Sequence, residues 1–198
     1  MSGPGRGAKA ALVDIDGTLV DSNYQHALAW FRALRRHGVT CEVRVLHHLI
    51  GMGGDQIVTA VAGEEVERRA GDAIRDAEKE LFREVMDEVV PLPDARRLLE
   101  STTARGLIDG WTTSEDVDAT KPEPDLIEAG LAVAGGGPAL MIGDSTWDCR
   151  AADRAGLPTI TVLTGGYCRE ELLAAGAAAV FDTLADAIDG IADRDLLA

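Results

Sequence analysis

Two aspartates separated by a single residue, Asp14 and Asp16, follow a short apolar run over Ala10–Val13. The run predicts a buried strand, and residues two apart on a strand point to the same side. Two carboxylates held this close repel each other unless a cation lies between them or one carries a proton. The pair therefore predicts a site for a hard metal ion with oxygen ligands, with one carboxylate free to act as a nucleophile.

The nine-residue string that begins at Asp14, DIDGTLVDS, is far more specific than an isolated Asp-x-Asp pair, which is also common in turns. It resembles the first signature of the haloacid dehalogenase-like (HAD) hydrolase superfamily. The resemblance implies that Asp14 attacks a phosphate and becomes an aspartyl phosphate. It also implies that Asp16 is the general acid/base, and that both residues hold Mg²⁺, Asp16 through its backbone carbonyl. The dehalogenating members lack the second aspartate, so Asp16 favours phosphoryl chemistry.

A second acidic string, GDSTWD at positions 143–148, follows the apolar run over 139–142. Ligands of open α/β sheets bind at the carboxyl ends of the strands. The string resembles the fourth HAD signature, which implies that Asp144 binds Mg²⁺ directly. Asp148 would then orient a metal-bound water or Asp144 itself. An Asx turn that caps the following helix is the alternative explanation.

The string KPEPD, at positions 121–125, precedes a predicted helix. It resembles the third HAD signature of the phosphoglycolate phosphatase-like members. The resemblance implies that Lys121 neutralises both the nucleophile and the transferred phosphoryl group, where a fixed cation stabilises the developing charge. An ordinary solvated surface lysine is the alternative.

The second HAD signature, an apolar strand that ends in a phosphate-binding Thr or Ser, is not at its expected place. Only fifteen positions separate Gly106 from Lys121, whereas a βαβ unit needs roughly 30 residues. About one such repeat is therefore missing near 104–107. Either the chain carries an internal deletion, or residues that were not observed are missing from the sequence at this point. A break in the backbone near 105–107 would indicate the second.

The run over 107–112 predicts a strand. Three hydroxyl residues, Thr112, Thr113 and Ser114, lie at and just after its end. These hydroxyls resemble the missing phosphate contact, but their spacing to Lys121 assigns them to the strand that precedes the third signature. Thr113 is retained as a candidate substrate contact.

The stretch from 24 to 90 contains helical patterns and almost no strand signal. Apolar residues recur at helical spacing at Ala27, Trp30, Phe31 and Leu34, and Gly38 is a plausible stop. Further helices are predicted over 42–50 and 55–62, and one long helix or a pair of helices over 64–89. Such an insertion after the first strand resembles the helical cap of many HAD enzymes.

Strands are also predicted over 139–142, 159–163 and 178–181, and helices separate most of the strands. This alternation predicts an α/β fold with a Rossmann-like parallel sheet and helices on both faces. We expect a HAD core domain over 1–20 and 94–198, with an inserted all-helical cap domain over 21–93.

Two positions in the expected cap are weaker candidates for substrate binding. His26 lies ten residues after Asp16, where related hexose-phosphate mutases carry a similarly placed His. A structural histidine is the alternative. Gly53 belongs to the glycine-rich run over 51–55, which resembles the cap loop that meets substrate. A permissive helix-to-helix turn is the alternative.

Composition narrows the partners. The formal net charge of −15 argues against binding to nucleic acid, and no run of about 18 apolar residues predicts a membrane span. The cysteines, Cys41, Cys149 and Cys168, are scattered, which predicts reduced thiols in the cytoplasm. The start of the chain has no apolar stretch typical of a signal peptide or an anchor.

Together these features predict a Mg²⁺-dependent phosphohydrolase that acts on a small phosphorylated metabolite through an aspartyl phosphate. Two alternatives stay open. One is a sugar phosphomutase that uses the same chemistry. The other is a catalytically weak binding or regulatory protein on the same scaffold, which the absent second signature motivates. Substrate identity and oligomeric state are left open.

Overall fold

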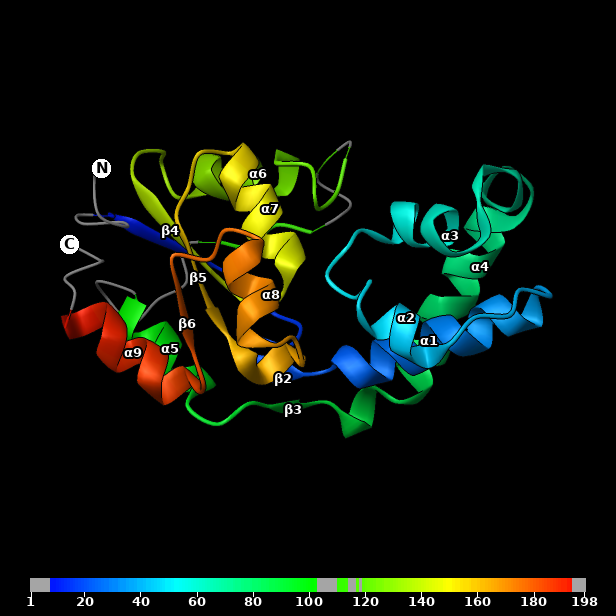
Figure 1. Cartoon of the computed structure of the whole chain (residues 1–198), viewed down its shortest axis with the longest axis horizontal. Coiled ribbons are helices and arrows are strands. Elements are labelled where there is room, and N and C mark those ends of the chain that lie inside the picture. The colour runs from blue at the N-terminus through cyan, green and yellow to red at the C-terminus, as the bar shows by residue number, and fades with distance from the viewer. Residues whose placement is uncertain (1–7, 103–109, 114–116, 118, 194–198) are drawn as a thin grey trace.

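The computed structural model describes residues 8–102, 110–113, 117 and 119–193. Within these residues the centre of the fold is a four-stranded parallel sheet (Figure 1). Its strands, in spatial order, are β1 (Ala10–Val13), β4 (Ala139–Gly143), β5 (Thr159–Val162) and β6 (Ala179–Phe181). All five residues of β4 are buried, as expected of a strand that is covered on both faces.

Helices cover both faces of this sheet (Figure 1). They are α5 (Ala95–Thr102), α6 (Asp125–Val133), α7 (Thr146–Arg154), α8 (Arg169–Ala174) and α9 (Leu184–Asp193), with a 3-10 turn, η3, at Leu163–Gly165. Alternation along β4 divides the core: Leu140 and Ile142 pack with α5 and α9, while Met141 packs with α6 and α7. The period of two thus places one apolar layer on each face.

A second group of helices lies beside the sheet (Figure 1). Its members are α1 (Asn23–Arg36), α2 (Val43–His47), α3 (Gly54–Ala62) and α4 (Glu64–Glu84). This group has its own apolar cluster, which includes Trp30, Leu34 and Ile74. On α4 the buried residues recur at helical spacing, and Glu78 is among them. Helix α1 ends at Arg36, and the predicted stop Gly38 follows with φ of 78°.

The chain passes between the two groups through a pair of two-residue strands. β2 (Val20–Asp21) and β3 (Val90–Pro91) run antiparallel, and a 3-10 turn, η1 (Met86–Glu88), precedes β3. The entry and the exit of the helical group are therefore adjacent. No helix in the described part of the chain is both long and apolar enough to cross a membrane.

The predicted α/β fold with a parallel sheet is confirmed, and the four strands of that sheet lie within about one residue of their predicted limits. The short strands β2 and β3 were not predicted. The helix predicted over 42–50 is shorter than expected and is reduced to α2. The segment over 64–89, predicted as one long helix or a pair, forms α4 and the 3-10 turn η1. The domain limits of 20/21 and 93/94 stay a prediction.

The strand predicted over 107–112 is wrong in its described part. Residues 110–112 do not form a strand, and Gly110 lies against Val133 of α6 instead. Residues 107–109 lie outside the described residues, as does the whole segment 105–107 in which a backbone break would distinguish the two explanations for the missing repeat.

Candidate active site

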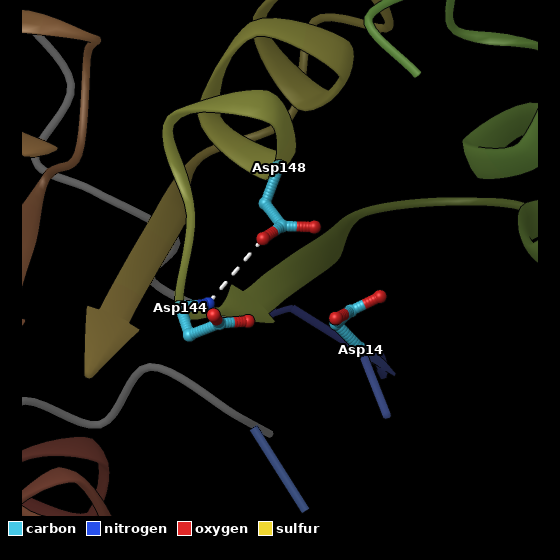
Figure 2. A group of neighbouring side chains, drawn as sticks. All are labelled: Asp14, Asp144 and Asp148. Carbon is cyan, nitrogen blue, oxygen red and sulfur yellow. Dashed lines mark hydrogen bonds between the residues drawn. The ribbon is translucent and has the colours of Figure 1, made fainter. Parts of the chain in front are cut away.

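Three aspartates converge at the carboxyl ends of β1 and β4 (Figure 2). Asp14 directly follows β1 and its N–H continues the ladder to the carbonyl of Ile142, at 2.9 Å. Asp144 directly follows β4, and Asp148 lies in the first turn of α7. One carboxylate oxygen from each of the three lies within 4.8 Å of the others. The neighbouring parallel strands thus bring together acids that are 130 positions apart in the sequence.

Lys121 completes this cluster from a different segment of the chain. Its Nζ donates to Oδ1 of Asp14 at 2.5 Å and to Oδ1 of Asp148 at 2.6 Å. The side chains are 8% exposed for Lys121, 20% for Asp14 and none for Asp148. Lys121 therefore bridges the predicted nucleophile and a buried acid, and is not a solvated surface lysine.

The remaining oxygen of Asp148 fixes the start of α7. Oδ2 accepts hydrogen bonds from the Ser145 N–H at 3.0 Å, from the Ser145 hydroxyl at 2.6 Å and from the Asp144 N–H at 3.3 Å. Ser145 and Asp148 form a reciprocal capping box. The helix-capping explanation is thus correct for this pair, and it does not displace the proposed site role. The same bonds hold Asp148 in place against Lys121.

Asp144 lies in a closely fitted cradle. Its Oδ1 accepts from the Thr18 hydroxyl at 3.0 Å and its Oδ2 from Nδ2 of Asn23 at 2.9 Å. A Cβ at Gly17 would come within 2.3 Å of the carboxylate, and one at Gly165 within 1.8 Å. Any side chain at either position would displace Asp144. Sequence reasoning did not single out Thr18 or Asn23.

The acids in this cluster need a cation. Burial raises the pKa of Asp14 to about 6, although Lys121 opposes the rise. Burial and the charges of Asp148 and Asp14 raise the pKa of Asp144 well above its usual range. One ammonium faces three carboxylates, and the donors are oxygen atoms. Such a set fits a divalent ion such as Mg²⁺.

Asp16 faces the helical group. Its Oδ1 accepts from the Ser22 hydroxyl at 2.5 Å and lies 3.6 Å from Nε2 of His26. Although burial alone would raise the pKa of Asp16, the contacts with His26 and Ser22 lower it overall. The Asp16 carboxylate is not in the three-aspartate group among the described residues, so its predicted metal role rests on the backbone carbonyl.

His26 connects Asp16 to helix α4. Its Nδ1 lies 3.0 Å from Oε1 of Glu78, and its ring stacks on Phe82 with the centroids 3.7 Å apart. Burial lowers the pKa of His26, but the contacts with Asp16 and Glu78 outweigh burial and raise the pKa to about 9. Glu78 was not predicted. A charged residue within the apolar stripe of an amphipathic helix was the available signal.

The glycine-rich run contacts the segment that carries Lys121. The Gly53 N–H donates to the Lys121 carbonyl at 3.0 Å, and Nε2 of Gln56 donates to the carbonyls of Thr120 at 3.0 Å and Lys121 at 3.3 Å. The Thr120 hydroxyl donates to the carboxylate of Asp55. Helix α3 is thus hydrogen-bonded to the loop that positions the lysine.

A cavity of about 540 Å³ lies between the two groups of helices. Six of its lining residues are Asp14, Asp16, His26, Gly53, Glu78 and Lys121. This volume is typical of small-molecule sites. Thr113 does not line it among the described residues. It lines a second cavity of about 440 Å³ that follows β1 and also reaches Asp14, Asp16 and Lys121.

Comparisons with known proteins agree with this geometry. A model of the HAD-hydrolase-like family matches residues 118–187. Validoxylamine A 7'-phosphate phosphatase of Streptomyces hygroscopicus subsp. limoneus is 27% identical over 183 residues, which cover 79% of this chain and 86% of that protein. Phosphoglycolate phosphatase of Rhodospirillum rubrum is 27% identical over 213 residues, which cover 89% and 88%. Because 213 positions exceed the 198 residues of this chain, that alignment contains gaps in this chain.

Solved structures are similar over nearly the whole chain. A hydrolase from Pseudomonas syringae superposes with a TM-score of 0.86 and 27% identity, covering 93% of this chain and 98% of that one. A putative beta-phosphoglucomutase from Bacteroides vulgatus superposes with a TM-score of 0.85 and 25% identity, covering 96% and 91%.

In its fold, in its strand-end acids and over residues 118–187 the chain is similar to the HAD-like hydrolases. Both relatives named above are phosphatases, and one of them is a phosphoglycolate phosphatase.

Proposed function

We propose that the chain hydrolyses a small phosphorylated metabolite, with Mg²⁺ as cofactor and an aspartyl phosphate on Asp14 as intermediate. The bridge from Lys121 to Asp14 and Asp148, beside Asp144, is the observation that carries the proposal. It places the proposed nucleophile against a fixed positive charge, and both residues line a cavity of about 540 Å³. The proposed domains are a HAD core over 1–20 and 94–198 and a cap over 21–93.

In the first half of the reaction, Oδ of Asp14 attacks phosphorus and the bond from phosphorus to the leaving oxygen breaks. For this step Asp16 must first take up a proton, since its contacts with His26 and Ser22 lower its pKa; it then gives that proton to the leaving oxygen, so the alcohol leaves neutral. In the second half, Asp16 takes a proton from water, which attacks the aspartyl phosphate and releases inorganic phosphate. Lys121 neutralises charge on the phosphoryl oxygens in both halves.

Asp14, Asp144 and the backbone carbonyl of Asp16 would hold the Mg²⁺. When bound, the ion supplies charge neutralisation at the phosphoryl group. Asp148 fixes both Lys121 and the turn that carries Asp144. Residues of the cap, His26 and Gly53 among them, line the cavity where the leaving group would lie, and exclude bulk water from it.

Hydrolysis of a panel of phosphometabolites, with Mg²⁺ and with excess chelator, tests the proposal. Phosphate release should require the metal, and the isosteric variant Asp14→Asn should lower turnover by ~10⁴-fold or more. After acid quench, a phosphorylated peptide containing Asp14 should be detectable by mass spectrometry. Substantial hydrolysis by a folded Asp14→Asn variant would reject the mechanism.

A sugar phosphomutase is the second candidate. The likeness to the putative beta-phosphoglucomutase and the position of His26 beside Asp16 favour it. It predicts net isomerisation of a sugar phosphate, with little release of inorganic phosphate. A folded protein that shows neither reaction on the panel would instead support the weak binding or regulatory alternative.

A further inference from the structure

Asn23 holds the carboxylate of Asp144 from outside the recognised strings. It is the first residue of α1, follows the β2 strand closely and is 4% exposed. Its Nδ2 lies 2.9 Å from Oδ2 of Asp144 and 3.5 Å from the carbonyl oxygen of Gly165. A residue of the helical group therefore contacts an acid of the sheet directly.

The chemistry of the neighbours fixes the orientation of this amide. Both the Asp144 carboxylate and the Gly165 carbonyl are acceptors, so the NH₂ group of Asn23 must face them. Oδ1 of Asn23 is buried and has no partner among the described residues. The geometry points to a role for Asn23 that is tied to Asp144.

The carboxylate group of Asp144 is not free to rotate, because each of its oxygens accepts a hydrogen bond. Thr18 donates to Oδ1 at 3.0 Å while Asn23 donates to Oδ2. The backbones of Gly17 and Gly165 close off the space around the same carboxylate. Each carboxylate oxygen keeps a further lone pair for a metal ion, so the two donors orient the group without blocking it.

The residue before Asn23 makes a parallel contact. Ser22 is fully buried and its hydroxyl donates to Asp16 at 2.5 Å. Two consecutive residues at the start of α1 thus hold the proposed acid/base and the proposed metal ligand. A movement of α1 about the β2 and β3 pair would therefore disturb the hydrogen bonds to both carboxylates.

We propose that Asn23 is a positioning residue that fixes the Asp144 carboxylate and thereby sets the affinity of the site for its divalent ion. This inference rests on the proposed function, since it takes Asp144 as a ligand of Mg²⁺. Groups that orient a metal ligand commonly contribute 10- to 100-fold to metal affinity or activity.

Metal binding without substrate is the direct test. Mg²⁺ binding to the full chain is measured by isothermal titration calorimetry for wild type, Asn23→Ala and Asn23→Asp. We expect Asn23→Ala to weaken binding by ~10- to 100-fold. Asn23→Asp keeps the shape but replaces the donor with an acceptor that faces Asp144, so we expect at least as large a loss. Gln25→Ala, two positions along the same helix, is the matched control and should bind Mg²⁺ like wild type.

Activity gives a second readout that a purely structural role would not produce. Turnover by Asn23→Ala should be low at limiting Mg²⁺ and should return to within a few-fold of wild type at saturating Mg²⁺, because the ligands themselves remain. Circular dichroism and thermal melts of both variants identify loss of folding. If one variant does not fold, the other decides.

The outcomes separate the two proposals. Equal Mg²⁺ affinity in wild type and a folded Asn23 variant overturns the role of Asn23 while leaving phosphatase activity intact. A wild-type chain that neither binds Mg²⁺ nor hydrolyses any phosphoester overturns both.

Discussion

The two sides of the cavity are built in different ways. On the sheet side, Asp14, Asp144, Asp148 and Lys121 are bonded to one another or held by the turn of α7, and adjacent strands fix their spacing. On the helical side, contacts with the sheet side include hydrogen bonds across a boundary, such as the two from Nε2 of Gln56 to the carbonyls of Thr120 and Lys121. Strand pairing therefore fixes Asp14 and Asp144 relative to each other, whereas the helical side is joined to the sheet side through side-chain and loop contacts.

The apolar interiors follow the same division. Leu34 and Ile74 belong to a cluster within the helical group, while Leu140 and Ile142 belong to one within the sheet group. Each group buries its own residues, so its internal stability does not depend on the orientation of the other. Relative motion of two such units is the usual expectation when the contact between them is small and polar.

Removing the charge of Lys121 should have the largest effect, since it affects the sheet side. Lys121→Met leaves Asp14 and Asp148 buried without their cation, which should lower turnover by ~10³-fold. It should also lower the free energy of unfolding by about 3–5 kcal/mol. Steady-state kinetics and urea denaturation measure the two effects. Lys9→Met, an exposed lysine just before β1, is the control, and similar effects from both variants would refute the assignment.

Substitutions that create a cavity in one apolar cluster test whether the helical group and the sheet group unfold independently. Leu34 and Leu140 are both fully buried, one in each cluster. Each substitution by Ala should cost about 2–5 kcal/mol. Leu34→Ala should shift the unfolding of the helical group alone, whereas Leu140→Ala should shift that of the sheet group. Urea denaturation monitored by hydrogen exchange distinguishes them, and identical effects on both groups would contradict the comparison.

Weakening the contact between the sides should have a smaller effect. Gln56→Ala removes two hydrogen bonds to the backbone of Thr120 and Lys121. At about 1 kcal/mol for each bond, kcat/KM should fall by roughly 10- to 30-fold. Gln56→Glu keeps the size but cannot donate, so it should behave like Gln56→Ala. Full activity in Gln56→Glu would mean that the carbonyls of Thr120 and Lys121 do not need these donors.

The smallest predicted effect is on how the free energy of unfolding depends on pH. It arises at a second contact between the helical side and the sheet side. His47 of α2 is 8% exposed and its ring centroid lies 6.2 Å from that of Tyr167 on the sheet side. Burial, with a contribution from His48, lowers the pKa of His47 below the ordinary 6.5. Above pH 6.5 both folded and unfolded states hold it neutral. Below that pH the unfolded state takes up the proton first, so the free energy of unfolding falls as the pH falls.

His47→Gln should remove this part of the pH dependence. Chemical denaturation of both proteins at about pH 7.5 and about pH 5.5 measures it, and wild type should lose more stability between the two conditions. Equal losses would show that His47 takes up a proton in the folded state as readily as in the unfolded one.

The sequence predicted the sheet side better than the helical side, for a physical reason. Register between parallel strands brings residues at their carboxyl ends together, so placing Asp14 and Asp144 after two apolar runs was enough to predict their convergence. The contacts of Asn23, Gln56 and Glu78 depend on how helices pack against a distant surface. No local period encodes that packing, although Glu78 within an apolar stripe was a usable signal.

The pairing of Val20 with Pro91 and of Asp21 with Val90 has a consequence for how such a chain can change. Because the chain leaves the sheet group and returns to it at neighbouring points, residues 22–89 form an insertion whose two ends are adjacent. A segment of another length or shape could replace it without stretching the sheet, provided that its ends meet. A replacement would still have to supply its own donors to Asp144 and to the Lys121 carbonyl. Evolution could thus alter substrate selection by replacing the insertion at 22–89, while Asp14, Asp144 and Lys121 stay unchanged.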